Sequence, residues 1–248
     1  DIEIERKGRK SKLPFPRVGG SYYHLSKIFD SYNVALANKA FGITATDIMQ
    51  GVVFGTKTDE ITNDDLATRF DFDSIWGTVL NKYIVQTVLL NKLLIYGKGL
   101  MTRGMLSLYD SINCMTLLID NPAEKGDYRI VNQIDDVYNT VELAKLVQKI
   151  AGEFGMSPEF ETVEDPRVEK EQHFFEVEHK ILPGLGFKRR KSMEEIIREM
   201  FEAVIKHKER AKLLEYLIYP TVYWKESTAL AHGTFKLPDE LYKYGGMV

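Results

Sequence analysis

The stretch SYYHLSKIFDSYNVALANKAFGITATDIMQGVVFG, residues 21–55, joins two patterns that together decide the fold class. Its first part has the spacing of one helical face, with apolar side chains at Leu25, Ile28, Phe29, Tyr32, Ala35 and Leu36. Its second part, residues 42–55, is β-branched, apolar and bounded by glycines, which is typical of a buried strand that leaves into a loop. A helix followed by a buried strand predicts α/β layering.

Beyond residue 55 the alternation of helix and strand continues. Residues 56–73 are acidic and have little periodicity, so we expect a solvated loop there. The other predicted elements, in chain order, are a helix at 74–91, a strand and turn at 92–99, a strand leading into a helix at 105–120, a strand at 127–133 and a helix at 141–150. This alternation supports an α/β fold.

The most regular helical pattern follows the basic run KRRK, residues 188–191. Ser192 and Glu195 have the spacing of a capping box, and apolar residues recur after them at helical intervals as far as residue 205. The basic run itself is interpreted as a solvated turn, because runs of like charge usually face water.

The composition is that of a globular protein and argues against two classes of partner. Of the 248 residues, 44% are hydrophobic, which is enough to fill the core of one large domain or two small ones. The net charge of −3 argues against nucleic acid or an anionic membrane as a partner. The single cysteine, Cys114, cannot form an internal disulfide and is expected to be a buried thiol.

Neither a membrane segment, nor an export signal, nor a metal site is predicted. No stretch approaches the roughly 20 apolar residues of a membrane helix. The start, DIEIERKGRKSKLPFP, lacks the apolar core of a signal peptide, so a cytoplasmic location is expected. Asp71 and Asp73 lack the glycine turn and the terminal glutamate of a calcium loop, so we expect no bound metal.

Tyr23 and Lys27 are four residues apart on the first predicted helix, which puts their side chains on one face a turn apart. A tyrosine titrates near pH 10, and a base at neutral pH needs its pKa lowered by roughly 3 units, worth about 4 kcal/mol. A lysine ammonium one turn away, helped by a cationic cofactor, can supply such a field. On spacing alone, a core tyrosine beside a surface lysine is the commoner arrangement.

A wider series of motifs favours a catalytic interpretation of Tyr23 and Lys27. In chain order the motifs are YYHLSK, GITATDIMQGVVFGTKTDE, LNKYIVQ, LLIYGKG, TRGMLSLYD, NPAEKGDYRIVNQ, DPRVE and YPTVYWK. The series resembles the C-terminal three-fifths of the extended short-chain dehydrogenase/reductases, in their nucleotide-sugar epimerase/dehydratase branch. Within that branch it resembles the UDP-sulfoquinovose synthase family, from residue 1 to about residue 225.

The resemblance implies an α/β enzyme that contains the C-terminal part of a Rossmann-type doubly wound sheet and a smaller α/β domain for the nucleotide sugar. The implied divisions are residues 1–55 in the NAD-binding Rossmann domain, 56–102 in the substrate domain, 103–133 returning to the Rossmann domain, and 134–248 in the substrate domain. The implied reaction is NAD-dependent synthesis of UDP-sulfoquinovose from UDP-glucose and sulfite, through 4-keto and 4-keto-5,6-ene intermediates.

By the same resemblance, three residues of the first helix are catalytic. Tyr23 as a phenolate would take the proton of the glucose 4-hydroxyl, and Lys27 would hold the nicotinamide ribose and lower the pKa of Tyr23. His24 replaces a small or apolar residue of the epimerases and would face the sugar C6, as an acid, a base or a group that positions sulfite. Gln50 and Val52 would join Tyr23 and Lys27 in contacting the NAD cofactor.

The resemblance also implies a set of residues that hold the UDP-sugar, in which two arginines suit the diphosphate. The set is Gln50, Gly51, Thr78, Tyr96, Arg103, Arg167 and Glu169. Two positions depart from the family pattern, because Met101 replaces a glutamine and Lys170 replaces an acidic ribose contact. Glu169 or Glu171 would have to make that ribose contact instead.

The family's glycine-rich turn, which cradles the pyrophosphate of the cofactor at a helix N-terminus, has no counterpart in this sequence. The resemblance therefore predicts that about 150 residues of the nucleotide-binding half are missing and are supplied by another segment or chain. On this interpretation the 248 residues alone are inactive. The family pattern also implies a homodimer paired through helices that include the one bearing Tyr23.

The sequence leaves other interpretations open. A UDP-sugar 4-epimerase or a 4,6-dehydratase would share the oxidation by Tyr23 and Lys27 without adding sulfite. A non-catalytic partner subunit would use the UDP-sugar pocket alone. If the protein is from a plant, the resemblance implies the plastid stroma in place of the cytoplasm.

Overall fold

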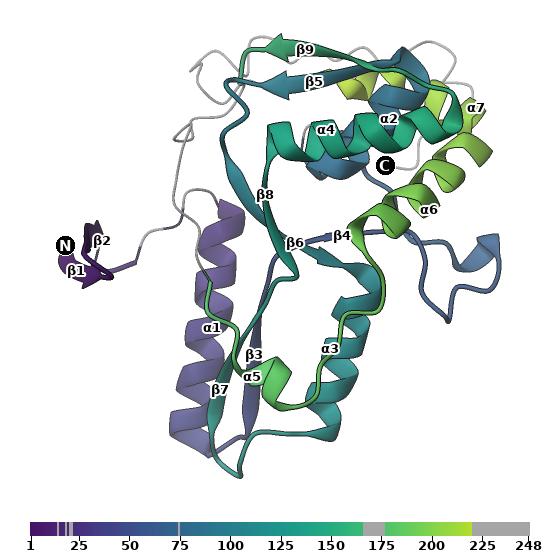
Figure 1. Ribbon diagram of the computed structural model, residues 1–248. Helices are drawn as coiled ribbons and strands as arrows, with labels where there is room; N and C mark the ends of the chain where they lie inside the picture. The colour runs from purple at the N-terminus through teal and green to yellow at the C-terminus, as the bar shows by residue number, and fades with distance from the viewer. Residues whose placement is uncertain (14, 18, 20–21, 74, 166–176, 220–248) are drawn as a thin grey trace, which may run out of the picture. The chain divides into compact units, whose positions relative to one another are not determined.

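The computed structural model describes residues 1–13, 15–17, 19, 22–73, 75–165 and 177–219 (Figure 1). The chain divides into two compact units and crosses between them several times. Unit 1 is built from residues 1–50, 112–133 and 178–188, and unit 2 from the described parts of residues 51–111, 134–177 and 189–248. Each unit has strands, helices and buried apolar side chains of its own.

Unit 1 is organised around two parallel strands, β3 (Ala45–Gln50) and β7 (Tyr128–Gln133). The register places Ala45 beside Tyr128 at one end and Gln50 beside Gln133 at the other. Parallel pairing requires a long crossover between the two strands, and parallel strands are expected of a Rossmann-type sheet. The strand predicted at 127–133 is therefore confirmed, and β3 forms the middle part of the run predicted as a strand at 42–55.

Two helices, α1 (Tyr22–Phe41) and α3 (Leu108–Asp120), cover opposite faces of this pair of strands, as Figure 1 shows. Successive side chains of a strand point to opposite faces. On the α1 face, Asp47 accepts a hydrogen bond from the Ser31 hydroxyl at 2.7 Å. The opposite face packs an apolar cluster that contains Ile48, Val131, Cys114, Leu118 and Leu182. Leu182 belongs to the short helix α5 (Ile181–Gly184), and Cys114 is fully buried, as predicted.

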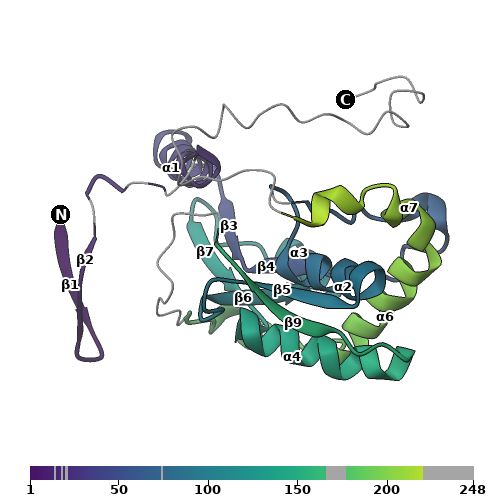
Figure 2. The same ribbon diagram turned by 90° about the horizontal axis from the view of Figure 1, so that it is seen from above.

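A β-hairpin for which no element was predicted precedes α1. Its strands, β1 (Ile2–Arg6) and β2 (Arg9–Leu13), pair antiparallel and lie side by side in Figure 2. Lys7 and Gly8 connect them, and both have positive φ angles, 49° and 75°, as a type I′ turn requires. Every residue of both strands is exposed. The alternation of Ile and Glu in the first strand therefore does not correspond to one buried and one exposed face.

Unit 2 contains two further small sheets. In the first, β4 (Val52–Phe54) runs parallel to β6 (Thr102–Ser107), and β6 pairs antiparallel with β8 (Asp136–Asn139). In the second, β5 (Lys92–Tyr96) runs parallel to β9 (Glu159–Val163). The strands β8 and β9 were not predicted, because neither has a continuous apolar run that would distinguish it from a loop.

The core of unit 2 lies among α2 (Val79–Leu90), α4 (Thr140–Ala151), α6 (Met193–Lys206) and β5. The helices α2 and α4 pack against β5 and against each other, and α6 packs against both helices (Figure 1). Fully buried side chains of this core include Leu80, Ile84, Leu93, Leu143, Ile150, Ile196 and Phe201. Burial of an aliphatic or aromatic side chain of this size contributes about 1.5–3 kcal/mol.

The helix predicted after the basic run is confirmed together with its cap. The Ser192 hydroxyl accepts a hydrogen bond from the Glu195 backbone N–H at 3.3 Å, and the Glu195 carboxylate accepts one from the Ser192 N–H at 2.8 Å. The helix at 141–150 is also confirmed, with an equivalent box between Asn139 and Glu142. Four short pieces complete the described chain, namely α7 (Lys208–Lys212), η1 (Asp64–Leu66), η2 (Gly152–Phe154) and η3 (Glu215–Ile218).

Two predicted elements differ in the structure. The run at 42–55 is not one strand, because the chain changes sheets at Gly51 and gives β3 on one side and β4 on the other. The helix predicted from residue 74 begins only at Val79. The reason is local, since the Asp73 carboxylate accepts hydrogen bonds from the N–H groups of Ile75 and Trp76 at 2.7 and 2.8 Å and holds a turn there.

Within the described ranges, no helix combines the length and the apolar character that crossing a membrane requires. Across those same ranges, no three His, Cys, Asp or Glu side chains gather in a way that could hold a metal ion.

Candidate active-site residues

The first two turns of α1 carry Tyr23, His24 and Lys27. The Lys27 ammonium lies 5.7 Å from the centre of the Tyr23 ring, so the two side chains share one face of the helix, as their spacing predicts. The His24 ring lies 5.9 Å from the Tyr23 ring, centre to centre, and is tilted by 54° to it. Tyr23 is 60% exposed, and His24 and Lys27 are exposed too, so all three are accessible from solvent in unit 1.

Lys27 also has a carboxylate partner on its own helix. Its ammonium donates to an Asp30 oxygen at 3.2 Å, an i, i+3 pair in which both side chains are more than half exposed. Exposed pairs of this kind contribute at most about 1 kcal/mol. A ligand that draws the Lys27 ammonium toward Tyr23 therefore has to break only this weak ion pair with Asp30.

Gln50 lies at the C-terminal end of β3, directly beside Gln133 at the end of β7. The Gln50 amide nitrogen donates a hydrogen bond to the side-chain oxygen of Gln133 at 2.9 Å. Gln50 is exposed, whereas Gln133 is only 1% exposed. Open α/β sheets bind their ligands at the carboxyl ends of parallel strands, which is the end where these two amides meet.

Gly51 and Val52 begin the part of the chain that belongs to unit 2. A Cβ atom on Gly51 would lie 2.6 Å from the carbonyl oxygen of Gly104, so only glycine fits this close approach of two backbones. Val52 pairs with Met105 of β6. The close approach of β6 therefore requires glycine at position 51, independently of the predicted contact between the Gly51 backbone and the ligand.

Thr78 and Tyr96 lie near a buried lysine. Thr78 occupies the N-cap of α2, but its side chain makes no capping bond, and its hydroxyl is buried without a hydrogen-bond partner in the part of the chain that is described. One turn later, Lys82 is only 8% exposed, and its ammonium lies 5.7 Å from the centre of the Tyr96 ring. Lys82 was not predicted as a site residue, although a lone lysine within the apolar run of α2 is a signal for one.

Arg103 lies on β6, opposite Tyr138 of β8, and is half-buried. Its guanidinium donates to the Met101 sulfur at 2.6 Å and to the Thr102 carbonyl at 3.4 Å. Met101 is the residue that was expected to stand in place of a glutamine, and the structure places its thioether beside this guanidinium. The other two charged residues of the predicted UDP-sugar site, Arg167 and Glu169, lie outside the described residues.

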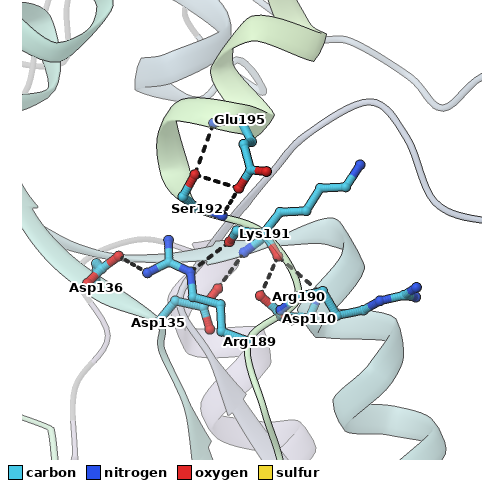
Figure 3. A network of polar contacts seen from close by, with 9 residues as sticks. Asp110, Asp135, Asp136, Arg189, Arg190, Lys191, Ser192 and Glu195 are labelled. Carbon is cyan, nitrogen blue, oxygen red and sulfur yellow. Dashed lines mark hydrogen bonds and ion pairs between the residues drawn. The ribbon is translucent and has the colours of Figure 1, made fainter.

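A separate polar network, drawn in Figure 3, surrounds the end of β6. Ser107 donates from its backbone N–H to Asp135 at 2.9 Å and from its hydroxyl to Asp110 at 2.8 Å. Burial raises the pKa of Asp135 to about 6, the bond from Ser107 opposes that rise, and the charge of Asp110 adds to it. Sequence patterning gave no sign of this pair of carboxylates.

The basic run 188–191 closes this network. It has no helix or strand and its residues are largely exposed, as a solvated turn would be, but three of its four cations, those of Arg189, Arg190 and Lys191, form ion pairs. Arg189 pairs with Asp136, and the Arg190 backbone N–H donates to Asp110 at 3.1 Å. Lys191 donates to the Tyr109 hydroxyl at 2.8 Å and pairs with Glu199. The predicted solvated turn is therefore confirmed in its exposure, and the structure adds the ion pairs, which were not predicted.

The structure groups the predicted site residues into two sets. Tyr23, His24, Lys27 and Gln50 belong to unit 1, and the first three of them are neighbours on one helix. The set in unit 2 comprises Gly51, Val52, Thr78, Tyr96 and Arg103. Two buried polar side chains that the sequence did not single out lie beside predicted residues, Gln133 next to Gln50 and Lys82 near Tyr96.

Comparison with curated proteins supports the resemblance that the motifs predicted. The chain is 41% identical over 225 residues to a UDP-sulfoquinovose synthase from Sulfolobus acidocaldarius, a match that covers 91% of this chain and 57% of that protein. It is 39% identical over 226 residues to the chloroplastic UDP-sulfoquinovose synthase of Spinacia oleracea, covering 91% of this chain and 46% of that protein. The chain thus spans about half the length of the curated relatives it matches. No protein-family model matches it.

Comparison with solved structures establishes the fold. A UDP-glucuronic acid 4-epimerase from Bacillus cereus, solved with UDP-glucuronic acid and NAD, superposes with a TM-score of 0.60 at 15% identity, covering 80% of this chain and 57% of that one. A UDP-N-acetylglucosamine 4-epimerase from Methanobrevibacter ruminantium gives 0.57 at 17% identity, covering 79% and 57%. The predicted Rossmann-type α/β fold is confirmed.

Proposed function

We propose that this chain supplies the catalytic helix and the UDP-sugar-binding part of a UDP-sulfoquinovose synthase. The observation that carries the proposal is the identity of 41% and 39% to two such enzymes across 91% of the chain. The geometry of α1 agrees with it, because Tyr23 and Lys27 share one solvent-accessible face.

The proposed reaction converts UDP-glucose and sulfite into UDP-sulfoquinovose. Tyr23 takes the proton of the 4-hydroxyl as C4 is oxidised to a ketone, and returns it when C4 is reduced at the end. The ketone acidifies the hydrogen at C5, so that water leaves from C5 and C6 and a 5,6-alkene remains. Sulfite then adds at C6 and a proton at C5. NAD, when bound, would supply the acceptor for the C4 hydrogen together with its two electrons, as a hydride, and give that hydride back to C4, so that it is not consumed.

The residues of α1 suit the nicotinamide end of that cofactor. Tyr23 and Lys27 are exposed and adjacent, and Lys27 would hold the ribose while its positive charge favours the phenolate of Tyr23. Gln50 and Val52 would complete these contacts. The sequence has no G-x-G-x-x-G turn for the pyrophosphate, so we assign that end of the cofactor to a further NAD-binding segment.

His24 is the residue that we assign to the chemistry at C6. Consecutive residues of a helix point about 100° apart, so His24 presents its ring beside that of Tyr23 without replacing it. The 5.9 Å between the two ring centres lets one sugar lie against both. As an acid or base, or by positioning sulfite, His24 would serve the elimination and addition steps.

We assign the grip on UDP to the remaining predicted residues. Arg103, and Arg167 outside the described residues, would contact the diphosphate. Thr78 and Tyr96 would line the nucleotide pocket. The Thr78 hydroxyl is buried and has no hydrogen-bond partner among the described residues, which is consistent with a ligand that completes its hydrogen bonding. Gln50 and the Gly51 backbone would contact the sugar, and Glu169 the ribose.

We further propose that the enzyme is a homodimer paired through α1. The exposed side of this helix carries large apolar side chains, including Phe29 at 53% and Leu36 at 63% exposure. Exposed apolar residues repeated along one helix are typical of a protein interface.

The experiment that tests the proposal uses the chain together with its NAD-binding half. UDP-glucose, NAD and sulfite are supplied, and the product is identified by mass spectrometry. Sulfite-dependent UDP-sulfoquinovose is expected, and Tyr23→Phe should abolish it. A C4 epimer formed without sulfite would indicate an epimerase, a 4-keto-6-deoxy sugar a dehydratase, and UDP-glucose binding without turnover a partner subunit. The 248 residues alone are expected to give no product.

A further inference from the structure

Gln133 is a buried polar side chain for which the proposed chemistry gives no role. It ends β7 at the carboxyl edge of the parallel pair and is only 1% exposed. Its side-chain oxygen accepts a hydrogen bond from the Gln50 amide nitrogen at 2.9 Å. A buried amide thus contacts Gln50, a predicted substrate contact.

The register explains why these two amides meet. Gln50 and Gln133 are partners in the parallel ladder, and both are the last residues of their strands. Because paired residues of a ladder point to the same face, the two side chains extend together beyond the sheet. Gln133 is held by burial, whereas Gln50 is exposed, so the buried side chain constrains the exposed one.

The direction of the hydrogen bond fixes the orientation of the Gln50 amide. An amide group has two different ends, an NH₂ that donates and a carbonyl oxygen that accepts, and rotation of the terminal torsion exchanges them. With its NH₂ committed to Gln133, Gln50 turns its carbonyl oxygen away from Gln133. A sugar hydroxyl that donates a hydrogen bond matches that orientation.

We propose that Gln133 is a positioning residue, which holds the Gln50 amide so that its carbonyl oxygen accepts a hydrogen bond from the sugar of the bound nucleotide sugar. The inference rests on the proposed function, in which Gln50 contacts the sugar and other residues hold the UDP. Gln133 acts through Gln50 and does not itself touch the substrate. Its effect is therefore confined to ligands that contain the sugar.

The test measures binding of UDP-glucose and of UDP by calorimetry, together with kcat and KM, for the enzyme with its NAD-binding half. Gln133→Met keeps the length of the side chain and removes the acceptor. UDP-glucose should bind about 3- to 10-fold more weakly, the loss expected from one neutral hydrogen bond. The dissociation constant of UDP should not change, and KM should rise with kcat nearly constant.

A double-mutant cycle separates positioning from a structural role. In a Gln50→Met background, Gln133→Met should change UDP-glucose binding by less than about 1.5-fold, because the residue it acts through is gone. Equal weakening of UDP and UDP-glucose, or no change for either, would overturn the positioning role and leave the proposed function standing. If the unaltered enzyme binds neither ligand, the proposed function fails first and the positioning role fails with it.

Discussion

Asp135 accepts a hydrogen bond at 2.9 Å from the backbone N–H of Ser107, the same residue whose hydroxyl donates to Asp110 at 2.8 Å. One serine at the end of β6 thus holds two carboxylates close together. Asp110 is fully buried and Asp135 partly buried, so solvent screens the repulsion between their negative charges only weakly. The pair is favoured when one of the two carries a proton.

Asp135→Asn should make stability less dependent on pH. Burial raises the pKa of Asp135 to about 6 in the folded protein, above the value of about 3.9 in an unfolded chain. Because the pKa of Asp135 is higher in the folded protein, its favourable contribution to the free energy of unfolding is complete below pH 4. That contribution is lost as the pH rises through 6. Asparagine keeps the acceptor for Ser107 without the charge, so we expect a gain of about 1–2 kcal/mol at pH 7.5 and none at pH 4.

Urea unfolding at pH 4, 6 and 7.5 measures this effect. Asp120→Asn, an exposed carboxylate at the end of α3, is the matched control and should show no such change with pH. A gain at pH 7.5 that persisted undiminished at pH 4 would mean that the charge of Asp135 is not its cause.

Gly51→Ala should destabilise unit 2, whereas Gly152→Ala should not. A Cβ on Gly51 would lie 2.6 Å from the Gly104 carbonyl oxygen, and neither backbone can move without separating β4 from β6. Overpacking of this kind costs about 1–3 kcal/mol. Gly152 has a helical φ of −57°, and apart from its own helix and chain neighbours no described atom lies within 4 Å of an added Cβ, so alanine there should gain about 0.4–1 kcal/mol. Thermal midpoints of the two variants should move in opposite directions.

Ser192→Ala should cost about 1 kcal/mol, because the Glu195 N–H at the start of α6 loses its acceptor. Ser192→Asp keeps an acceptor at the cap and should restore most of that stability. Chemical denaturation of the three proteins measures the difference. Equal stability of the alanine and serine proteins would mean that water replaces the cap at no cost.

The helix of that cap was predictable from sequence because its signals are local. Ser192, Glu195 and the apolar spacing after them lie within one segment, so they need no tertiary information. The break at Gly51 and the pairing of Gln50 with Gln133 were not predictable, because each depends on a strand that is distant in sequence. The paired charges of the basic run were missed for the same reason.

Lys191→Met should destabilise the protein by about 1–3 kcal/mol, since it leaves the largely buried Glu199 carboxylate without its cation. Adding Glu199→Gln should recover part of the loss, because the stranded charge is then gone. Lys188→Met, an exposed position of the same basic run, is the control and should stay within about 0.5 kcal/mol of the unaltered protein. Unfolding curves recorded at pH 7 measure both variants. Equally small changes in stability for Lys191→Met and Lys188→Met would mean that the ion pair of Lys191 does not stabilise the protein.

His24→Ala and Tyr23→Phe should fail at different steps of the proposed reaction. Tyr23 acts at C4, so its variant forms no ketone, and the sugar C5 should take up no solvent deuterium when UDP-glucose is incubated with the enzyme in D₂O. His24 acts at C6, so its variant should still exchange C5 while sulfosugar formation falls about 100-fold or more, the usual size of a general acid–base contribution. Both side chains are exposed, so neither change should unfold the protein. Mass spectrometry of the recovered UDP-glucose and of the product reports both steps, and loss of C5 exchange in His24→Ala would move that histidine from the chemistry at C6 to the first oxidation.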